Sequence, residues 1–369
     1  MSDNHARRRA ALRDLLRSAD LDALLVTELR NIRYLTGFTG SQAALLVRAD
    51  GEPGAEDGTV FCTDGRYDTQ SAAQVPDLER VIDRPSELVL ARRLGAEPAR
   101  HRRTGFESGH VTVDALDALT EAAAGVQLVR APGLVERLRQ VKDADEVEAL
   151  RAACAAADRA LDDLIQQGGL RPGRTELQVA RELEARMLDH GAAGPSFDTI
   201  VAAGPHSAVP HHRPTGAELA EGDFVKMDFG ALVDGYHSDM TRTVVLGEPA
   251  DWQRELYELV RSAQAAGREA VRAGAEAREV DGAARAVIEA AGHGEHFVHG
   301  LGHGVGLEIH EAPALSQRAG GTIHPGMAVT VEPGVYLPER GGVRIEDTLV
   351  VRESTPELLT LTTKELLAV

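Results

Sequence analysis

Four carboxylates and one histidine in the second half of the chain have the types and spacing of a shared metal site. Asp228 and Asp239 lie in residues 224–230 and 236–246, two alternating runs that predict strands. The runs are joined by a connection that ends in Asp234-Gly235, a strong two-residue hairpin signal. A tight turn there makes Asp228 a diagonal neighbour of Asp239, with Cβ atoms about 7 Å apart. This separation suits two carboxylates that bind one or two cations between them. Bare carboxylates on one buried face would repel each other unless a cation or a hydrogen-bond donor intervenes.

A second pair of carboxylates follows the same pattern. Glu332 ends the alternating run 327–332, and Glu346 lies within the alternating run 343–350. A side-chain period of two places Arg344 and Glu346 on one face of the second strand. We therefore expect a second acidic hairpin.

A glycine-rich segment, residues 299–311, lies between the two hairpins. His299 and His303 are four residues apart, as in the helix of a zinc protease, but glycines occupy positions 300, 302, 304 and 306. Each glycine costs about 1 kcal/mol in a helix interior. The segment therefore predicts a loop that carries histidines.

In order and local context, these residues resemble the pita-bread metallopeptidases, which include Xaa-Pro aminopeptidase (aminopeptidase P), prolidase and methionine aminopeptidase. The matching strings are Met227-Asp228-Phe229-Gly230, Ser238-Asp239-Met240-Thr241-Arg242-Thr243, His299-Gly300-Leu301-Gly302-His303-Gly304, Val331-Glu332-Pro333-Gly334 and Arg344-Ile345-Glu346-Asp347. The resemblance implies that five side chains bind two metal ions: Asp228, Asp239, His303, Glu332 and Glu346.

The same resemblance implies a role for each site residue. Asp239 and Glu346 bridge both ions, Asp228 completes one, and His303 with Glu332 completes the other. Glu332 also steers the proton of the attacking water. His310 matches the donor to the oxyanion, His211 the histidine on the leaving side, and His299 a histidine that lines the pocket. Arg344 and Thr241 are expected to support the ligands.

His212, which follows His211 directly in the chain, is the closest competitor for the role of His211, and His206 lies five residues before His211. Both are expected to be loop or solvent-exposed histidines.

The charge of the five residues bears on the cofactor. Four carboxylates carry four negative charges, which two divalent cations balance. Oxygen-dominated ligation with one histidine favours Mn²⁺, Co²⁺ or Fe²⁺, and Zn²⁺ also fits. The expected chemistry is two-metal hydrolysis.

The bulk composition limits the partners. The chain has 369 residues and a net charge of −18, which argues against nucleic acid and anionic membranes. No run approaches the ~18 apolar residues of a membrane span. Cys62 and Cys154 fit reduced core thiols of a cytoplasmic enzyme. Arg7-Arg8-Arg9 precedes no apolar segment, so we expect an amphipathic helix and no secretion signal.

Two domains of mixed α/β (α+β) class are expected. Residues 1–136 alternate strand-like and helical runs, and Asn31 to Gly40 and Thr63 to Tyr67 resemble the creatinase-like amino-terminal domain of aminopeptidase P and prolidase. Residues 137–369 resemble the pita-bread domain. It opens on a capping box, Asp143 to Glu146, and a long helix to about Ile165.

A weak internal repeat supports a pseudo-twofold second domain. Gly173, Val179 and Gly191 recur 101 positions later as Gly274, Val280 and Gly292. In both copies a helix leads toward an acidic hairpin, so the two hairpins are expected to face each other.

The expected activity is removal of the amino-terminal residue from small peptides with proline in second position. Prolidase, which cleaves Xaa-Pro dipeptides, is the first alternative, and a non-catalytic pita-bread binding module is the second. The extra domain disfavours methionine aminopeptidase, and the full ligand set disfavours metal-free creatinase. The resemblance also implies a homodimer or a higher homo-oligomer.

Overall fold

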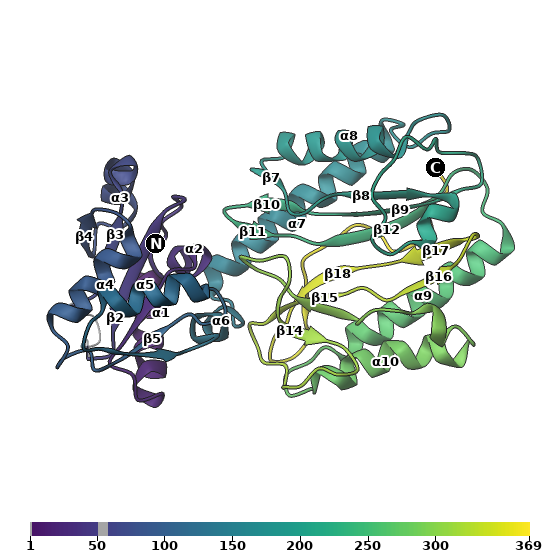
Figure 1. Cartoon of the computed structure of the whole chain (residues 1–369). Helices are drawn as coiled ribbons and strands as arrows, with labels where there is room; N and C mark the ends of the chain where they lie inside the picture. The colour runs from purple at the N-terminus through teal and green to yellow at the C-terminus, as the bar shows by residue number, and fades with distance from the viewer. Residues whose placement is uncertain (1, 51–57) are drawn as a thin grey trace. The chain divides into compact units, whose positions relative to one another are not determined.

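A computed structural model describes residues 2–50 and 58–369 of the chain, which divide into two units (Figure 1). The first unit is Met1–Arg139 and the second is Gln140–Val369. The sequence placed the division between residues 136 and 137.

The first unit is built on a six-stranded mixed sheet with strand order β4-β3-β2-β1-β5-β6. Its strands are β1 (Ala23–Val26), β2 (Ala43–Arg48), β3 (Val60–Thr63), β4 (Glu79–Ile82), β5 (Arg103–Phe106) and β6 (Gln127–Arg130). Its helices are α1 (Ser2–Ser18), α2 (Leu29–Thr36), η1 (Gly65–Tyr67), α3 (Asp68–Gln74), α4 (Ser86–Ala96), α5 (Val113–Ala122) and α6 (Leu134–Arg139). Apolar residues of α4 and α5 pack on one face of the sheet, which confirms the expected α/β class.

Two elements of the first unit differ from the sequence expectation. Strand β5 lies between β1 and β6 and was missed, because Arg103-Thr104-Gly105-Phe106 has a single large apolar residue. Helix α2 covers Asn31 to Thr36 of the Asn31 to Gly40 motif, for which no helix was predicted. It ends at Gly37, whose φ of 79° is the left-handed conformation of a helix C-cap.

The second unit contains two sheets that carry the site, with further short strands. Its helices are α7 (Ala144–Gln166), α8 (Glu176–Asp189), η2 (Gly204–Ala208), α9 (Asp251–Ala270), α10 (Ala277–Ala290) and η3 (Gly294–His296). Its strands are β7 (Gly194–Pro195), β8 (Ile200–Ala203), β9 (Phe224–Phe229), β10 (Ala231–Val233), β11 (Tyr236–His237), β12 (Met240–Val245), β13 (Gly302–Gly304), β14 (Glu311–Leu315), β15 (Ala328–Val331), β16 (Gly334–Leu337), β17 (Gly341–Arg344), β18 (Asp347–Val350) and β19 (Glu357–Leu358).

A helix pair covers each of these two sheets, as Figure 1 shows. The sheet β12-β9-β8 packs on α7 and α8, and the sheet β14-β13-β15-β18-β19 packs on α9 and α10. Alternation along β9 sends Val225 and Met227 into the helix-covered core and leaves Asp228 on the opposite face. In β15, Val329 and Val331 likewise point into the core that α9 and α10 cover. The carboxylates therefore lie on the faces that the helices leave uncovered.

The expected internal repeat is confirmed as a repeat of structure. Gly173 and Gly274 have φ of 83° and 85°, and each precedes the second helix of its pair. Val179 in α8 and Val280 in α10 are both fully buried in their helix-covered cores. The expected capping box is also present, since the Asp143 side chain accepts from the Glu146 backbone at the start of α7.

The first acidic hairpin has the expected turn and diagonal pairing, but the expected continuous strand 236–246 is wrong, because Ser238 and Asp239 interrupt it between β11 and β12. Asp234 and Gly235 have φ of 47° and 74°, as a type I′ turn requires. The register of β9 and β12 pairs Asp228 with Thr241, so Asp239 is the diagonal neighbour of Asp228. At Gly230 an added Cβ would lie 1.8 Å from the Ser238 carbonyl oxygen, so only glycine fits where the strands approach most closely.

The second hairpin differs from expectation in one respect. The continuous strand over residues 343–350 is wrong, because Ile345 and Glu346 interrupt it between β17 and β18. The Glu346 backbone N–H donates to the Thr241 carbonyl oxygen, 3.1 Å away, and so leaves its own sheet. The strand pairs on either side of the interruption keep the same register: β15 and β18 pair Val331 with Asp347, and β16 and β17 pair Gly334 with Arg344. It brings Glu332 opposite Glu346.

Other expectations concern the thiols and the membrane. Cys62 and Cys154 are both free and buried, which confirms their assignment as core thiols. Within residues 2–50 and 58–369, no helix combines the length and apolar character that a membrane crossing requires.

Candidate metal centre

A cavity of about 420 Å³ in the second unit brings the five expected ligands together. Its lining includes Asp228 on β9, Asp239 before β12, His303 on β13, Glu332 after β15 and Glu346 between β17 and β18. We call these five residues the pocket cluster. Every one of them lies at a strand or at its end, so the two sheets fix their positions.

His303 is oriented by a backbone hydrogen bond. Its Nδ1 donates to the Gly304 carbonyl oxygen at 3.0 Å, which leaves Nε2 as the free ligand atom. Nε2 lies 3.5 Å from Asp239 Oδ2 and 3.4 Å from Glu332 Oε1. The ligand atoms of Asp239, His303 and Glu346 lie within 4.8 Å of one another. This is the arrangement of a ligating imidazole that a second hydrogen bond holds in place.

Two buried oxygens in this cluster have no hydrogen-bond partner among the described residues. They are Asp228 Oδ1 and Glu346 Oε1. Buried polar atoms are nearly always hydrogen-bonded or bound to an ion, and these two belong to carboxylates. The residues present therefore fit divalent cations.

Arg344 is a permanent cation beside the cluster. Its Nη2 donates to Asp228 Oδ2 at 2.5 Å, and its Nε donates to Thr241 Oγ1 at 2.9 Å and lies 3.9 Å from Glu332 Oε2. Thr241 in turn donates to Glu346 Oε2 at 2.7 Å. One guanidinium cannot neutralise four carboxylates, so Arg344 positions the cluster and leaves most of its charge unbalanced.

The pKa values show this imbalance. Burial, followed by the charges of Glu346 and Asp228, raises the pKa of Asp239 well above its usual value. Burial and the charges of Glu332 and Asp228 act in the same way on the pKa of Glu346. Burial raises the pKa of Glu332 to about 8, although Arg344 opposes the shift. Burial also lowers the pKa of His303 to about 4, which keeps its imidazole neutral.

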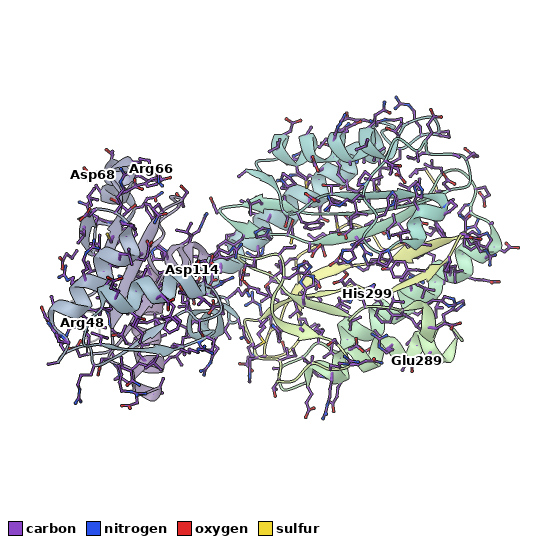
Figure 2. All side chains as sticks on the ribbon, viewed as in Figure 1. Arg48, Arg66, Asp68, Asp114, Glu289 and His299 are labelled. Atoms are coloured by element: carbon purple, nitrogen blue, oxygen red, sulfur yellow. The ribbon has the colours of Figure 1, made fainter. Side chains whose placement is uncertain are left out.

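Three further histidines that the sequence singled out line the same cavity: His211, His299 and His310. His310 packs edge-on against His303, with ring centroids 4.3 Å apart. Burial lowers the pKa of His299 to about 3, and its Nε2 lies 2.8 Å from the Tyr336 hydroxyl. Figure 2 labels His299 among the strands of the second unit.

Lys226 and Arg344 hold the segment that precedes His211. Lys226 Nζ donates to the Val209 carbonyl oxygen at 2.6 Å, and Arg344 Nη1 donates to that of Pro210 at 3.2 Å. His212, the competitor to His211, is not among the residues that line the cavity and instead bonds to Glu176.

Some residues at the site were not found from the sequence. Tyr336 contacts Arg344 and His299 through its hydroxyl, and Phe197, Ile200 and Ile309 give the cavity an apolar wall. Tyr336 lies two residues after the Val331-Glu332-Pro333-Gly334 string, and this closeness to a predicted ligand could have pointed to it.

The sequence matches two protein families in the same order along the chain. Residues 148–353 match metallopeptidase family M24, and residues 8–141 match the creatinase/prolidase N-terminal domain. The chain belongs to metallopeptidase family M24. Its fold is accordingly a creatinase-type amino-terminal domain followed by the pita-bread catalytic domain.

Solved structures and relatives of this M24 chain agree over nearly its whole length. Xaa-Pro dipeptidase from Bacillus anthracis is 38% identical, with a TM-score of 0.93, over 99% of this chain and 100% of that one. Xaa-Pro dipeptidase of Pyrococcus horikoshii is 33% identical over 94% of this chain and 95% of its own length. X-Pro aminopeptidase from Thermotoga maritima is 32% identical, with a TM-score of 0.86, over 95% of this chain and 98% of that one.

Proposed function

We propose that this M24 metallopeptidase hydrolyses Xaa-Pro dipeptides. The observation that carries the proposal is the pocket cluster, five side chains of metal-binding type in one cavity, two of whose carboxylate oxygens have no hydrogen-bond partner in the part of the chain that the structure describes. Its substrate is suggested by the similar Xaa-Pro dipeptidases from Bacillus anthracis and Pyrococcus horikoshii. These names favour the dipeptidase alternative over the aminopeptidase that the sequence led us to expect.

Two divalent ions would be held by the pocket cluster. By the resemblance to the family, Asp239 and Glu346 would serve both ions, Asp228 one of them, and His303 with Glu332 the other. Such ions would lower the pKa of a water and polarise the scissile carbonyl. The donor set is dominated by oxygen, which supports Mn²⁺ as the ion.

The chain's own groups then handle the proton and the charge. We assign to Glu332 the transfer of the proton from the attacking water, since its carboxylate lies beside His303 at the cavity wall. Burial lowers the pKa of His310, so its imidazole is neutral near pH 7 and retains one N–H to donate to the developing oxyanion. His211 lies on the same cavity and is assigned to the leaving side.

Proline itself demands an unusual site. An Xaa-Pro bond is a tertiary amide without N–H, so an enzyme cannot grip it through the usual backbone hydrogen bond. Recognition has to rest on the shape of the ring. Phe197, Ile200 and Ile309 offer an apolar wall for it.

Aminopeptidase activity is the second candidate, because the Thermotoga maritima X-Pro aminopeptidase shares the fold at a TM-score of 0.86. Measured kcat/KM values on matched Xaa-Pro and Xaa-Pro-Yaa peptides separate the two. We expect the dipeptide to be cleaved at least about tenfold faster, a difference of about 1.4 kcal/mol. Faster cleavage of the tripeptide would favour the aminopeptidase, and no metal-stimulated cleavage of either would favour a binding module.

A further inference from the structure

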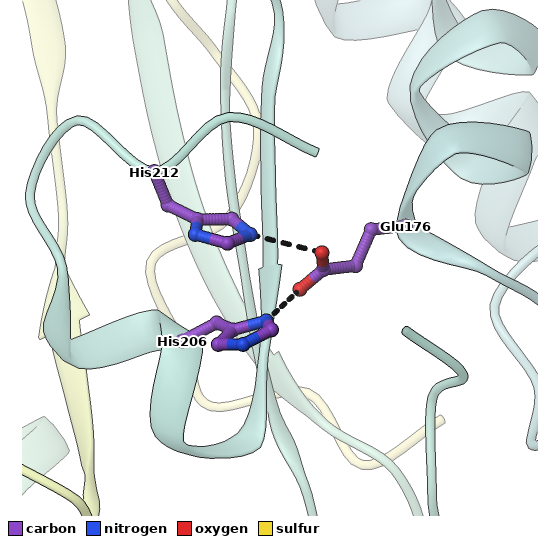
Figure 3. A group of neighbouring side chains, drawn as sticks. All are labelled: Glu176, His206 and His212. Carbon is purple, nitrogen blue, oxygen red and sulfur yellow. Dashed lines mark hydrogen bonds and ion pairs between the residues drawn. The ribbon is translucent and has the colours of Figure 1, made fainter. Parts of the chain in front are cut away.

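A second cluster of metal-binding side chains lies outside the cavity. Glu176 begins α8, His206 lies in η2, and His212 lies in the segment that follows. Figure 3 shows both imidazole rings directed at the same carboxylate. We call these three residues the Glu176 cluster. The expectation that His206 and His212 are merely loop or solvent-exposed histidines does not account for this convergence.

The geometry of the cluster is compact. His206 Nδ1 lies 2.9 Å from Glu176 Oε1, and His212 Nε2 lies 2.9 Å from Glu176 Oε2. The two rings stack with centroids 4.4 Å apart, and each directs one nitrogen at Glu176. All three ligand atoms lie within 4.8 Å of one another. Two imidazoles and one carboxylate form a ligand set that Zn²⁺ uses with water in its fourth position.

Glu176 is held as a ligating carboxylate should be. Three other donors orient it: Ala203 N at 2.9 Å to Oε1, and Thr215 N and Oγ1 at 2.9 and 2.7 Å to Oε2. These bonds survive if an ion replaces the two histidine contacts, and they would then orient the carboxylate from behind. The hydrogen bonds hold the pKa of Glu176 at about 2 even though burial alone would raise it, so the carboxylate is ionised.

The charge of the cluster also calls for a cation. The Glu176 side chain is fully buried, and among the described residues its only ion-pair partners are the two histidines. Asp223 lies close by and adds a second carboxylate, whose pKa burial and then Glu176 raise. A divalent ion bound by neutral imidazoles would balance both negative charges.

Access to the cluster is open on one side. The side chain of His206 is 42% exposed, that of His212 is 11% exposed, and Glu176 has none of its surface in water. An ion can therefore reach the two imidazoles from solvent, while the carboxylate supplies the buried end of the site.

We propose that Glu176, His206 and His212 bind a divalent transition-metal ion of the Zn²⁺ type, separate from the pocket cluster. The ion takes the place of the two hydrogen bonds between the imidazoles and the carboxylate. Each neutral imidazole gives up the proton on the nitrogen that faced Glu176 to solvent and takes one from solvent on its other ring nitrogen, so the ion binds the deprotonated nitrogen. The site is independent of the proposed peptidase function, because none of its three residues lines the cavity.

Zinc stoichiometry tests the proposal. The full chain is dialysed to equilibrium against micromolar Zn²⁺ and bound zinc is counted by mass spectrometry, with the H206Q/H212Q double variant alongside. We expect the variant to bind one equivalent fewer per chain than the unsubstituted protein. Equal binding by both would overturn the site and leave the cluster as a hydrogen-bonded support.

Two controls keep the result specific. The H293Q/H296Q variant removes another histidine pair, with Nδ1 atoms 3.3 Å apart, and should lose no zinc. The single variant H206Q changes only the most exposed ligand, so it tests the site even if the double variant fails to fold. It should weaken binding of the same equivalent, and unchanged affinity would count against the proposal.

The position of the ion is tested separately. In crystals soaked with Zn²⁺, anomalous scattering at the zinc edge should give a peak bounded by Glu176, His206 and His212. The D239N variant should keep this peak even where zinc in the cavity is lost, so a failure of the pocket cluster cannot be mistaken for a failure of this site. Peaks confined to the cavity would contradict the proposal.

Discussion

The pocket cluster and the Glu176 cluster both combine histidine with buried carboxylates, but they differ in how those carboxylates are hydrogen-bonded. In the cavity, Asp228 Oδ1 and Glu346 Oε1 are buried and have no hydrogen-bond partner within residues 2–50 and 58–369. In the Glu176 cluster, both carboxylate oxygens accept at least two hydrogen bonds. Without cations, the first arrangement leaves carboxylate oxygens unsatisfied. In the second, every carboxylate oxygen is hydrogen-bonded, and only the negative charge remains unbalanced.

The proximity of histidine and carboxylate therefore does not by itself predict how tightly a metal site binds. Burial and mutual repulsion raise the pKa of Asp239 and Glu346, whereas the Glu176 pKa is lowered to about 2. An ion in the cavity relieves repulsion, and an ion at Glu176 has to displace two hydrogen bonds. We therefore expect the cavity to bind divalent ions more tightly.

The largest expected effect comes from Asp239→Ala. The substitution removes a carboxylate assigned to both ions, so kcat/KM on an Xaa-Pro dipeptide should fall by on the order of 10³-fold or more, with loss of bound metal. Asp189→Ala, an exposed aspartate at the end of α8, is the matched control and should change neither. Full turnover by the Asp239 variant would remove that residue from the centre.

Arg344→Lys tests the support of the pocket cluster. Lysine keeps the charge but cannot bond Asp228, Thr241 and Tyr336 at once, as the Arg344 guanidinium does. Metal affinity or kcat/KM should fall by roughly 10–100-fold, the usual cost of losing a group that orients metal ligands. Arg278→Lys, at an exposed ion pair, serves as the control. Equal losses in both variants would mean that the effect is not specific to the site.

Metal removal should destabilise the protein in a pH-dependent way. The pKa of Glu332 is raised from 4.5 to about 8 in the metal-free fold. A carboxyl with a raised folded-state pKa contributes stability that is complete below its unfolded pKa and is lost as pH rises through about 8. Asp239 and Glu346 shift in the same direction. The chelated protein should therefore lose stability as pH rises from 6.5 to 9.

Thermal unfolding of chelated and Mn²⁺-loaded protein measures this loss. The pKa of His303 is lowered to about 4, so its effect on stability has the opposite sign and is confined to pH values below 6.5. It therefore does not affect the stability change between pH 6.5 and 9. For a unit of this size 1 kcal/mol corresponds to about 2–4 °C, so the gap in Tm should widen by several degrees toward pH 9. A gap that narrows with rising pH would refute the assigned repulsion.

The smallest effect is expected at the Glu176 cluster without added zinc. His206→Gln removes one of five hydrogen bonds to a carboxylate that keeps the other four. The cost should be about 0.5–1.5 kcal/mol of unfolding free energy, measured by urea denaturation of chelated protein. A much larger loss would show that the remaining hydrogen bonds do not satisfy the Glu176 carboxylate in the absence of an ion.

Local sequence signals predicted the geometry of the first hairpin. The Asp234-Gly235 turn and the alternation of the flanking strands suffice to make Asp228 and Asp239 diagonal neighbours. The capping box at Asp143 and the buried Val179 and Val280 follow in the same way from patterns within single segments.

Features set by distant contacts could not be predicted. Glu346 leaves its strand because its N–H bonds to Thr241, which is far away in the sequence. Strand β5 exists because β1 and β6 flank it, although its own residues carry little strand signal. The Glu176 cluster joins three separate segments, and nothing in the sequence around His206 and His212 indicates that both contact a glutamate on α8.

The most direct measurement is a crystal structure of the full chain grown with Mn²⁺, with anomalous data recorded for manganese. We expect two peaks in the cavity, with Asp239 and Glu346 contacting both, Asp228 one, and His303 with Glu332 the other. A cavity in which Arg344 alone pairs with these carboxylates and no ion binds would contradict it.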